Sequence, residues 1–228
     1  MALVILSACQ KTSQSKLQAA YDYFPDSIGY WIDYRVDSIF IDQLAGIRDT
    51  FSYYLREEIG ETFLDNDNRS AQKIYRFKKD SVNHQWRLAD VWHFNKMVKS
   101  VERVEENLRF VKLIFPITAS QTWAGNNYVL KENTNAFYQD WQYRYLDIHA
   151  ALSIDSLNFD STITVDQQDL LTDHFWYYGR EIYAYKVGLV YKELINLTSD
   201  EALLLEDSWR LNAQKGMILT YKVVDYKR

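Results

Sequence analysis

Hydrophobic and polar side chains alternate with a period of two along much of the chain, and this pattern restricts the fold more than any other feature. Between Tyr30 and Phe40 most even-numbered positions hold Tyr, Ile, Val or Phe, whereas three odd-numbered positions hold Asp or Arg. Such alternation is typical of a strand with one buried face and one wetter face. The same pattern recurs at Phe51–Arg56 and Ile74–Lys78. Further strands are predicted at Trp86–Met97, Leu108–Ile117, Trp141–Ile154, Ser161–Gln167, Glu181–Leu194 and Lys215–Tyr226.

These strands follow one another with few Gly or Pro residues between them, since the 228 residues include only 7 Gly and 2 Pro. The sequence shows no regular alternation of strands with helices, which disfavours a parallel α/β fold. We therefore predict a mostly β fold over residues 25–228, a single domain in which one antiparallel meander sheet is curled into a half-barrel or barrel. One or two short helices are predicted, at Ser199–Trp209 and Asn133–Tyr138.

The charge balance argues against a nucleic-acid partner. Lys and Arg total 26 against 31 Asp and Glu, which gives a net charge of −5. Proteins that bind nucleic acid usually carry an excess of basic side chains to meet the phosphates. No nucleic acid is therefore expected among the partners of this protein.

The N-terminal residues predict an attachment to the cell envelope. Residues 1–8 are uncharged and largely apolar, as at the end of a signal peptide. They lead into Leu6-Ser7-Ala8-Cys9, which resembles the lipobox of bacterial lipoproteins, and this resemblance implies that Cys9 is lipidated. Residues 9–24 would then be the lipidated cysteine and a polar tether. The alternative is an N-terminal strand or helix with Cys9 as a buried free thiol.

Lipidation would make the membrane a partner through acyl chains alone. Two or three acyl chains on one cysteine anchor a protein stably, whereas a single chain is marginal. Position 10 holds Gln rather than Asp, which resembles lipoproteins of the outer membrane rather than those retained at the inner one. The resemblance therefore implies anchoring at the outer membrane and leaves open which of its faces carries the protein.

Three parts of the chain resemble, in order, a group of lipoproteins from Gram-negative bacteria. They are Tyr23–Pro25 with Gly29–Tyr34, then Gln121–Asn126, then Phe159–Val165 with Glu181–Glu193. This resemblance covers most of the chain and implies no particular activity. A half-barrel like that of the lipoprotein carriers of bacterial envelopes has the same strand count. Gly29-Tyr30-Trp31 also resembles the Gly-x-Trp opening of lipocalins, which implies that Trp31 closes a barrel floor against an Arg.

The sequence lacks the patterns that usually carry catalysis or bind metal. The four histidines are widely separated and form no zinc-binding spacing, and no Gly-x-Ser-x-Gly nucleophile motif is present. A cluster of charges at 99–109 looks like a solvated face, because acidic and basic residues alternate in it. We predict a protein that is not an enzyme and uses no metal or cofactor. The histidines are His84, His93, His149 and His174, and the charge cluster consists of Lys99, Glu102, Arg103, Glu105, Glu106 and Arg109.

Aromatic side chains make up 16% of the residues, and they offer the remaining indication of function. Strand alternation assigns most of them to buried faces, where aromatic pairs stabilise sheets. Five that fall off or beside this pattern are candidate contacts to a lipid, glycan or protein partner: Tyr54, Tyr143, Trp176, Tyr177 and Tyr178. We predict a lipid-anchored envelope lipoprotein that acts as a non-enzymatic binding or structural module. The alternatives are a carrier of lipid or another apolar ligand in a half-barrel cavity and, less favoured, a hydrolase.

Overall fold

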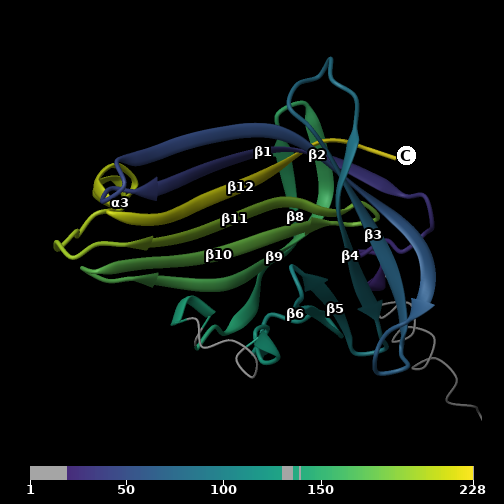
Figure 1. The fold of residues 1–228 in the computed structure, drawn as a ribbon. Coiled ribbons are helices and arrows are strands. Elements are labelled where there is room, and N and C mark those ends of the chain that lie inside the picture. Colours follow the sequence, from purple (N-terminus) through teal and green to yellow (C-terminus); the bar gives the residue numbers. More distant parts are fainter. Residues whose placement is uncertain (1–19, 130–135, 139, 228) are drawn as a thin grey trace, which may run out of the picture.

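One antiparallel sheet forms most of the protein in this computed structural model, which describes residues 20–129, 136–138 and 140–227 (Figure 1). Its twelve strands confirm the prediction of a mostly β antiparallel fold. The strands are β1 (Trp31–Asp42), β2 (Ile47–Leu64), β3 (Ser70–Lys79), β4 (Arg87–Lys96), β5 (Ser100–Glu105), β6 (Leu108–Ile114), β7 (Thr122–Trp123), β8 (Tyr143–Ile154), β9 (Leu157–Leu171), β10 (Phe175–Ala184), β11 (Gly188–Thr198) and β12 (Lys215–Tyr226).

The sheet consists of two meanders that are joined through the first and last strands. Strands β1 to β6 pair in chain order, and so do β7 to β12, while β1 also pairs with β12. Ile32 of β1 lies opposite Tyr226 of β12, and Asp42 lies opposite Lys215. The first and last strands therefore lie side by side in the middle of the sheet (Figure 1).

The two outer ends of the sheet come together as well. The Val111 N–H on β6 donates to the Gly125 carbonyl at 2.8 Å, and the Trp123 indole N–H donates to the Val111 carbonyl at 2.8 Å. The Tyr145 hydroxyl of β8 donates to the Ile114 carbonyl at 2.7 Å. The sheet is thus curled until it almost closes, which agrees with the predicted half-barrel or barrel.

Local irregularities bend the long strands. In β8 the register shifts between Leu146 and Ala150, and Asp147 and His149 there have positive φ angles of 49° and 63°. Extra residues of this kind increase the bend and twist of a strand. The curl is therefore encoded in individual strands as well as in the overall pairing.

The main core lies on the inner face of the curled sheet. Ile32, Tyr34 and Val36 of β1 point into it, as the alternation in the sequence predicts. Tyr23 and Phe24 also belong to this core, with exposed fractions of 1% and 8%. These two residues fall within the predicted tether of residues 9–24, but they pack with the domain because their aromatic rings fill the inner face.

A smaller core lies on the outer face at the far end of the sheet. Helix α3 (Glu206–Asn212) buries Trp209 against it completely. The predicted helix at Ser199–Trp209 thus begins seven residues later than expected, at Glu206. Leu203, which precedes the helix, packs on this core. The other members of this core are Ile41, Trp176, Ile195, Leu197, Ala213 and Ile218.

Two other segments differ from the predictions or extend beyond the described residues. The strand predicted at Glu181–Leu194 is a hairpin, because Lys186 and Gly188 adopt positive φ angles of 61° and 97° that turn the chain. The helix predicted at Asn133–Tyr138 is described only as the 3₁₀ turn η1 (Ala136–Tyr138), and the rest lies outside the described residues. Within the described ranges, none of the helices has both the length and the apolar character needed to cross a membrane.

Candidate functional site: a charged and aromatic cavity

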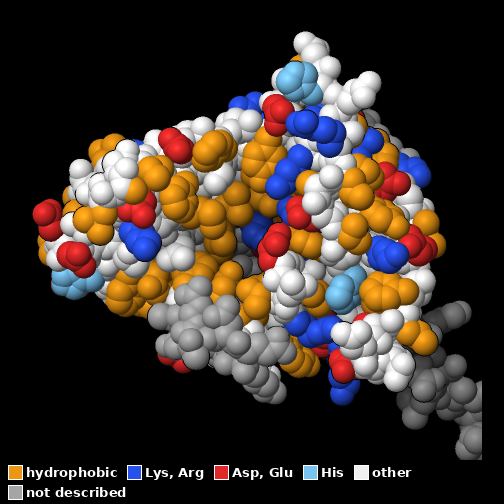
Figure 2. All heavy atoms as spheres, viewed as in Figure 1, with side chains coloured by type: hydrophobic (Ala, Val, Ile, Leu, Met, Phe, Trp, Pro, Cys, Tyr) orange, Lys and Arg blue, Asp and Glu red, His pale blue; other side chains and the backbone are white. Residues whose placement is uncertain are grey.

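A cavity of about 270 Å³ opens on the inner face, between the two meanders of the sheet. Figure 2 shows the surface hollowed between β9–β12 and β3–β5, with hydrophobic side chains in the hollow and Lys or Arg side chains beside them. Aromatic, aliphatic and charged residues all line the cavity. They are Tyr53, Arg76, Lys78, Trp92, Glu105, Glu106, Leu108, Phe110, Lys112, Tyr138, Trp141, Tyr143, Gln167, Lys192, Leu194, Met217, Leu219 and Tyr221.

Two lysines and two glutamates form a buried ionic group, of which Lys112, Lys192 and Glu105 line this cavity and Glu181 lies behind them. The Lys112 Nζ lies 2.8 Å from Glu181 Oε1 and 3.0 Å from Glu105 Oε1. The Lys192 Nζ lies 3.3 Å from Glu105 Oε2 and 3.5 Å from Glu181 Oε1. The four side chains come from β5, β6, β10 and β11, so this group ties the two meanders together.

A second ionic group adjoins the first. Glu57 Oε1 accepts from Arg103 Nη2 at 2.5 Å and from Arg76 Nε at 3.1 Å. The Arg76 guanidinium also donates to the Tyr221 hydroxyl at 3.0 Å and lies 3.4 Å from the centre of the Trp92 ring. Arg103 Nε is 3.2 Å from Glu105 Oε1, which links the two groups into one network.

The network stays ionised because its charges stabilise one another. Burial raises the pKa of the Glu105 and Glu181 carboxyl groups, but Lys112 and Lys192 outweigh burial and lower both, that of Glu105 well below its usual range. Burial lowers the pKa of Lys192, and the same two carboxylates outweigh it and raise that pKa. Burial and the nearby Glu181 carboxylate raise the pKa of Tyr143 well above its usual value. The tyrosine therefore keeps its proton at neutral pH.

Two hydrogen-bond donors in the cavity wall have no acceptor among the described residues. They are the indole Nε1 of Trp141 and the amide Nε2 of Gln167, both buried. Buried polar groups in folded proteins almost always have a partner, and an unpaired donor costs about 1–3 kcal/mol. Gly179 allows both side chains to sit here, since a Cβ at that position would lie 2.7 Å from the Trp141 ring and 3.0 Å from Gln167 Oε1.

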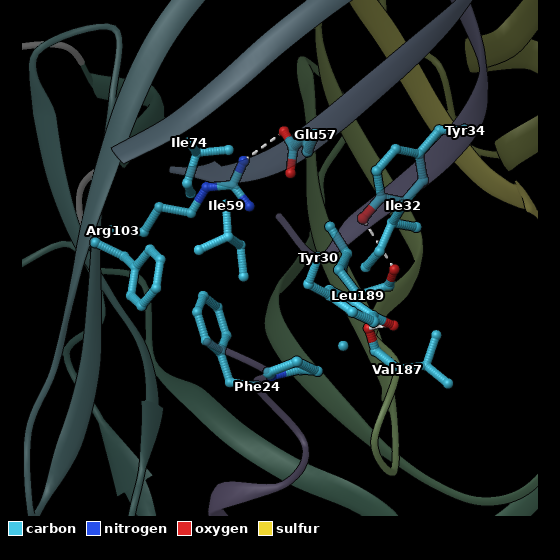
Figure 3. A pocket seen from close by; sticks show the side chains of 13 residues that line it. Phe24, Tyr30, Ile32, Tyr34, Glu57, Ile59, Ile74, Arg103, Val187 and Leu189 are labelled. Atoms are coloured by element: carbon cyan, nitrogen blue, oxygen red, sulfur yellow. Dashed lines mark hydrogen bonds and ion pairs between the residues drawn. The ribbon is translucent and has the colours of Figure 1, made fainter. Parts of the chain in front are cut away.

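A second, smaller cavity of about 40 Å³ lies behind the Glu57–Arg103 pair. Figure 3 shows this pair beside Ile59 and Ile74, with Tyr34 donating to the Leu189 carbonyl at 3.0 Å on the other side. The walls are mainly aliphatic and aromatic. A space of this size has room for only one or two water molecules, so it is too small for an organic ligand.

The candidate contact residues predicted from the sequence do not form one patch. Tyr143 lies in the core with 1% exposure and donates its hydroxyl to Asn126 at 2.7 Å. Trp176 is buried in the outer-face core. Neither ring is therefore available for contact with a partner at the outer surface of the protein, because the strands that carry them are covered on the relevant faces.

The remaining candidates are half-buried and lie on different faces. Tyr177 packs against Phe137 on the inner face, whereas Tyr178 alternates to the outer face. Tyr54 lies on the outer face of β2, where Arg35 approaches its ring at 5.6 Å. Only Tyr143 of the five candidates lines the cavity, and Cys9 lies outside the described residues.

The charge cluster at 99–109 was predicted to be a solvated face, and this prediction is wrong for its central residues. Glu102, Arg103 and Glu105 are 4%, 6% and 9% exposed. Strand alternation places Arg103 and Glu105 on the inner face and Glu102 on the outer face, where Arg109 Nη1 donates to it at 2.8 Å. Both faces of β5 are covered, so the mixed charges form buried ion pairs.

Two lysines in the sequence indicated the buried charges of the cavity. Lys112 falls on the same face of its predicted strand as Phe110 and Ile114, and Lys192 shares a face with Leu194. A charged residue at a position that alternation reserves for the core requires a buried partner. The sequence did not show which residue would pair with Lys112, because its partner Glu181 lies 69 residues away along the chain.

The four histidines contact different groups. His149 Nδ1 is 2.8 Å from the Tyr23 hydroxyl and 3.2 Å from Ser161 Oγ, and His174 Nδ1 is 3.2 Å from the Ser199 carbonyl. The described part of the chain contains no group of three or more His, Cys, Asp or Glu residues arranged to hold a metal ion. Trp31, which the lipocalin resemblance placed at a barrel floor, stacks on Arg56 at 4.1 Å on the outer face.

Comparison with known proteins gives little further information. No protein-family model matches the chain, and no curated protein matches it. Among solved structures it is similar to a LolA superfamily protein, NE2245, from Nitrosomonas europaea, with 14% sequence identity and a TM-score of 0.21 over 94% of this chain and 92% of that chain. A similarity of this strength does not establish a shared fold.

Proposed function

We propose that this protein is a non-enzymatic binding protein that holds a small amphipathic organic molecule in the inner cavity. The observation that carries the proposal is the cavity of about 270 Å³ with two buried donors that lack acceptors. Ligand cavities are typically lined by aromatic and aliphatic side chains with a few polar groups that fix orientation. The combination of Trp92, Phe110 and Leu194 with Trp141 and Gln167 matches this description.

The volume sets the size of the ligand. Cavities for organic ligands usually measure about 300–1,000 Å³, so this one lies near the lower limit. It accommodates a compact molecule, or the end of a longer one whose remainder extends from the opening. The carrier interpretation therefore has more support than the structural-module interpretation, because two of the five candidate partner contacts, Tyr143 and Trp176, are buried.

Attachment to the outer membrane through Cys9 remains part of the proposal. Its support is the resemblance of residues 6–9 to a lipobox and the polar residues that follow. A membrane-anchored protein with a small cavity would bind its ligand within the cell envelope. The proposed partners are then the membrane, through lipid, and the small ligand.

Binding of a neutral fluorescent probe tests the proposed function. N-phenyl-1-naphthylamine, an uncharged aromatic amine, should gain fluorescence when it enters the cavity, and native mass spectrometry of freshly purified protein should show a bound small molecule. Leu194→Trp places a larger ring in the cavity wall and should weaken probe binding about tenfold or more, since overfilling a packed site is costly. Leu88→Trp, at a residue 56% exposed, is the matched control. Equal binding by both variants would refute the proposed function, as would a parent protein that binds neither this probe nor its sulfonated analogue.

A further inference from the structure

We propose that the ligand of the inner cavity carries an anionic group, a carboxylate or a phosphate, attached to an apolar body. This inference rests on the proposed function and specifies its ligand. The charge of the cavity wall supports it first. Arg76, Lys78, Lys112 and Lys192 line the cavity, against two carboxylates, Glu105 and the exposed Glu106.

The buried part of the network also has more cations than anions. Arg76, Arg103, Lys112 and Lys192 have side chains that are at most 12% exposed. Among the residues that the structure describes, three carboxylates as deeply buried face them: Glu57, Glu105 and Glu181. Asp90, the further partner of Arg76, is 31% exposed and so lies partly in water. A buried charge without full compensation is costly, and a ligand anion would supply the missing negative charge.

The unpaired groups in the wall are donors. An indole N–H can only donate a hydrogen bond, and an amide NH₂ likewise offers hydrogens. The buried Nε1 of Trp141 and Nε2 of Gln167 therefore call for acceptor oxygens on the ligand, which carboxylates and phosphates provide in excess. The charge count and the donor count are independent, and both point to the same class of ligand.

The cations differ in exposure, which suggests how the anion meets them. The Lys78 side chain is 43% exposed and only weakly paired, since its Nζ is 3.9 Å from the Asp90 carboxylate. Lys112 and Lys192 are 4% and 12% exposed and lie deeper in the wall. An incoming anion would first be attracted by the accessible Lys78 and then reach the buried donors, while the aromatic walls enclose the apolar body.

A pair of probes that differ by one anionic group tests this inference. N-phenyl-1-naphthylamine and 8-anilino-1-naphthalenesulfonate share the same aromatic amine, and only the second carries a sulfonate. We expect the parent protein to bind the sulfonate probe about tenfold more tightly or better, a difference of about 1.4 kcal/mol. Inorganic phosphate alone should displace the sulfonate probe poorly, because it lacks the apolar body. Full displacement by equimolar phosphate would overturn the requirement for that body.

Two substitutions that keep the deep ion pairs intact test whether the preference for the sulfonate probe depends on Gln167 and Lys78. Gln167→Met removes the unpaired donor with little change of shape, and Lys78→Met removes the accessible cation. Each should lower the affinity for the sulfonate probe about fivefold more than it lowers the affinity for the neutral probe. Lys222→Met, at an exposed position on β12 outside the cavity lining, is the control and should change neither. Thermal denaturation of each variant checks that it is folded.

The outcomes separate the inference from the proposed function. If both probes bind the parent protein equally, or if the preference for the sulfonate probe survives both substitutions, the inference of an anionic ligand is wrong. The proposed binding function would still hold in either case. If neither probe binds, the proposed function fails and the inference fails with it.

Discussion

Lys112→Met should destabilise the protein more than any single change in a surface ion pair. Its Nζ lies 2.8 Å from Glu181 and 3.0 Å from Glu105, and its side chain is 4% exposed. Removing one partner of a buried ion pair typically costs about 3–5 kcal/mol. Lys192 remains 3.5 Å and 3.3 Å from the same carboxylates, so we expect about 3 kcal/mol. At about 2–4 °C per kcal/mol for a chain of this size, the Tm should fall by about 10 °C.

Urea denaturation followed by tryptophan fluorescence measures the loss. Lys73→Met is the matched control, because Lys73 Nζ lies only 2.6 Å from Glu61 but the two side chains are 36% and 54% exposed. Exposed pairs contribute at most about 1 kcal/mol. Adding Glu181→Gln to Lys112→Met should recover about 1–3 kcal/mol, since it removes the buried carboxylate that has lost its shorter ion pair. If Lys112→Met costs no more than Lys73→Met, the ionic group does not hold the two meanders together.

Three further predictions concern packing, pH and anchoring. Gly179→Ala should lower the free energy of unfolding by about 1–3 kcal/mol and weaken probe binding, because the new methyl group would displace the Trp141 ring; unchanged melting and binding would contradict this. The pKa of Glu105 is lower in the folded state, so its contribution to stability should be complete above about pH 4.3 and should fall as the pH drops further. The pKa of Lys192 is raised in the folded state, so its contribution should be complete below about pH 10.4 and should be lost as the pH rises further. A urea midpoint that stays constant between pH 3 and 5 (roughly one unit either side of the pKa of a free carboxyl group) would refute the prediction for Glu105. Cys9→Ser should move the protein from the membrane to the soluble fraction, and equal partitioning of mutant and parent would count against lipidation.

The sequence predicted the strands well where one face is buried and the other is wet. The alternation from Tyr30 to Phe40 lies within and beside β1, and Lys215–Tyr226 coincides with β12. A period-two pattern depends only on neighbouring residues in the sequence, so strands that show it can be predicted without knowing the fold. The turn at Lys186–Gly188 was missed because apolar residues continue on both sides of it.

The cavity was not predictable to the same degree, because its chemistry depends on pairs from distant strands. Glu57 and Arg103 are 46 residues apart, and Lys192 and Glu105 are 87 apart. In the sequence, the charges around Arg103 resemble an exposed face, since alternating signs are typical of one. These charges are buried only because both faces of β5 are covered, and both faces are covered because the whole sheet is curled.

The pairing of β1 with β12 has a consequence for the order in which the protein is made. During synthesis the first meander leaves the ribosome early, but its β1 edge has no partner until residues 215–226 have emerged. Contacts of such long sequence separation form late and slowly. The cavity takes walls from both meanders, so it comes into existence only when the final strand arrives. Loss of β12 would thus remove the pairing that joins β1 to β11, together with the part of the cavity wall that Met217, Leu219 and Tyr221 provide.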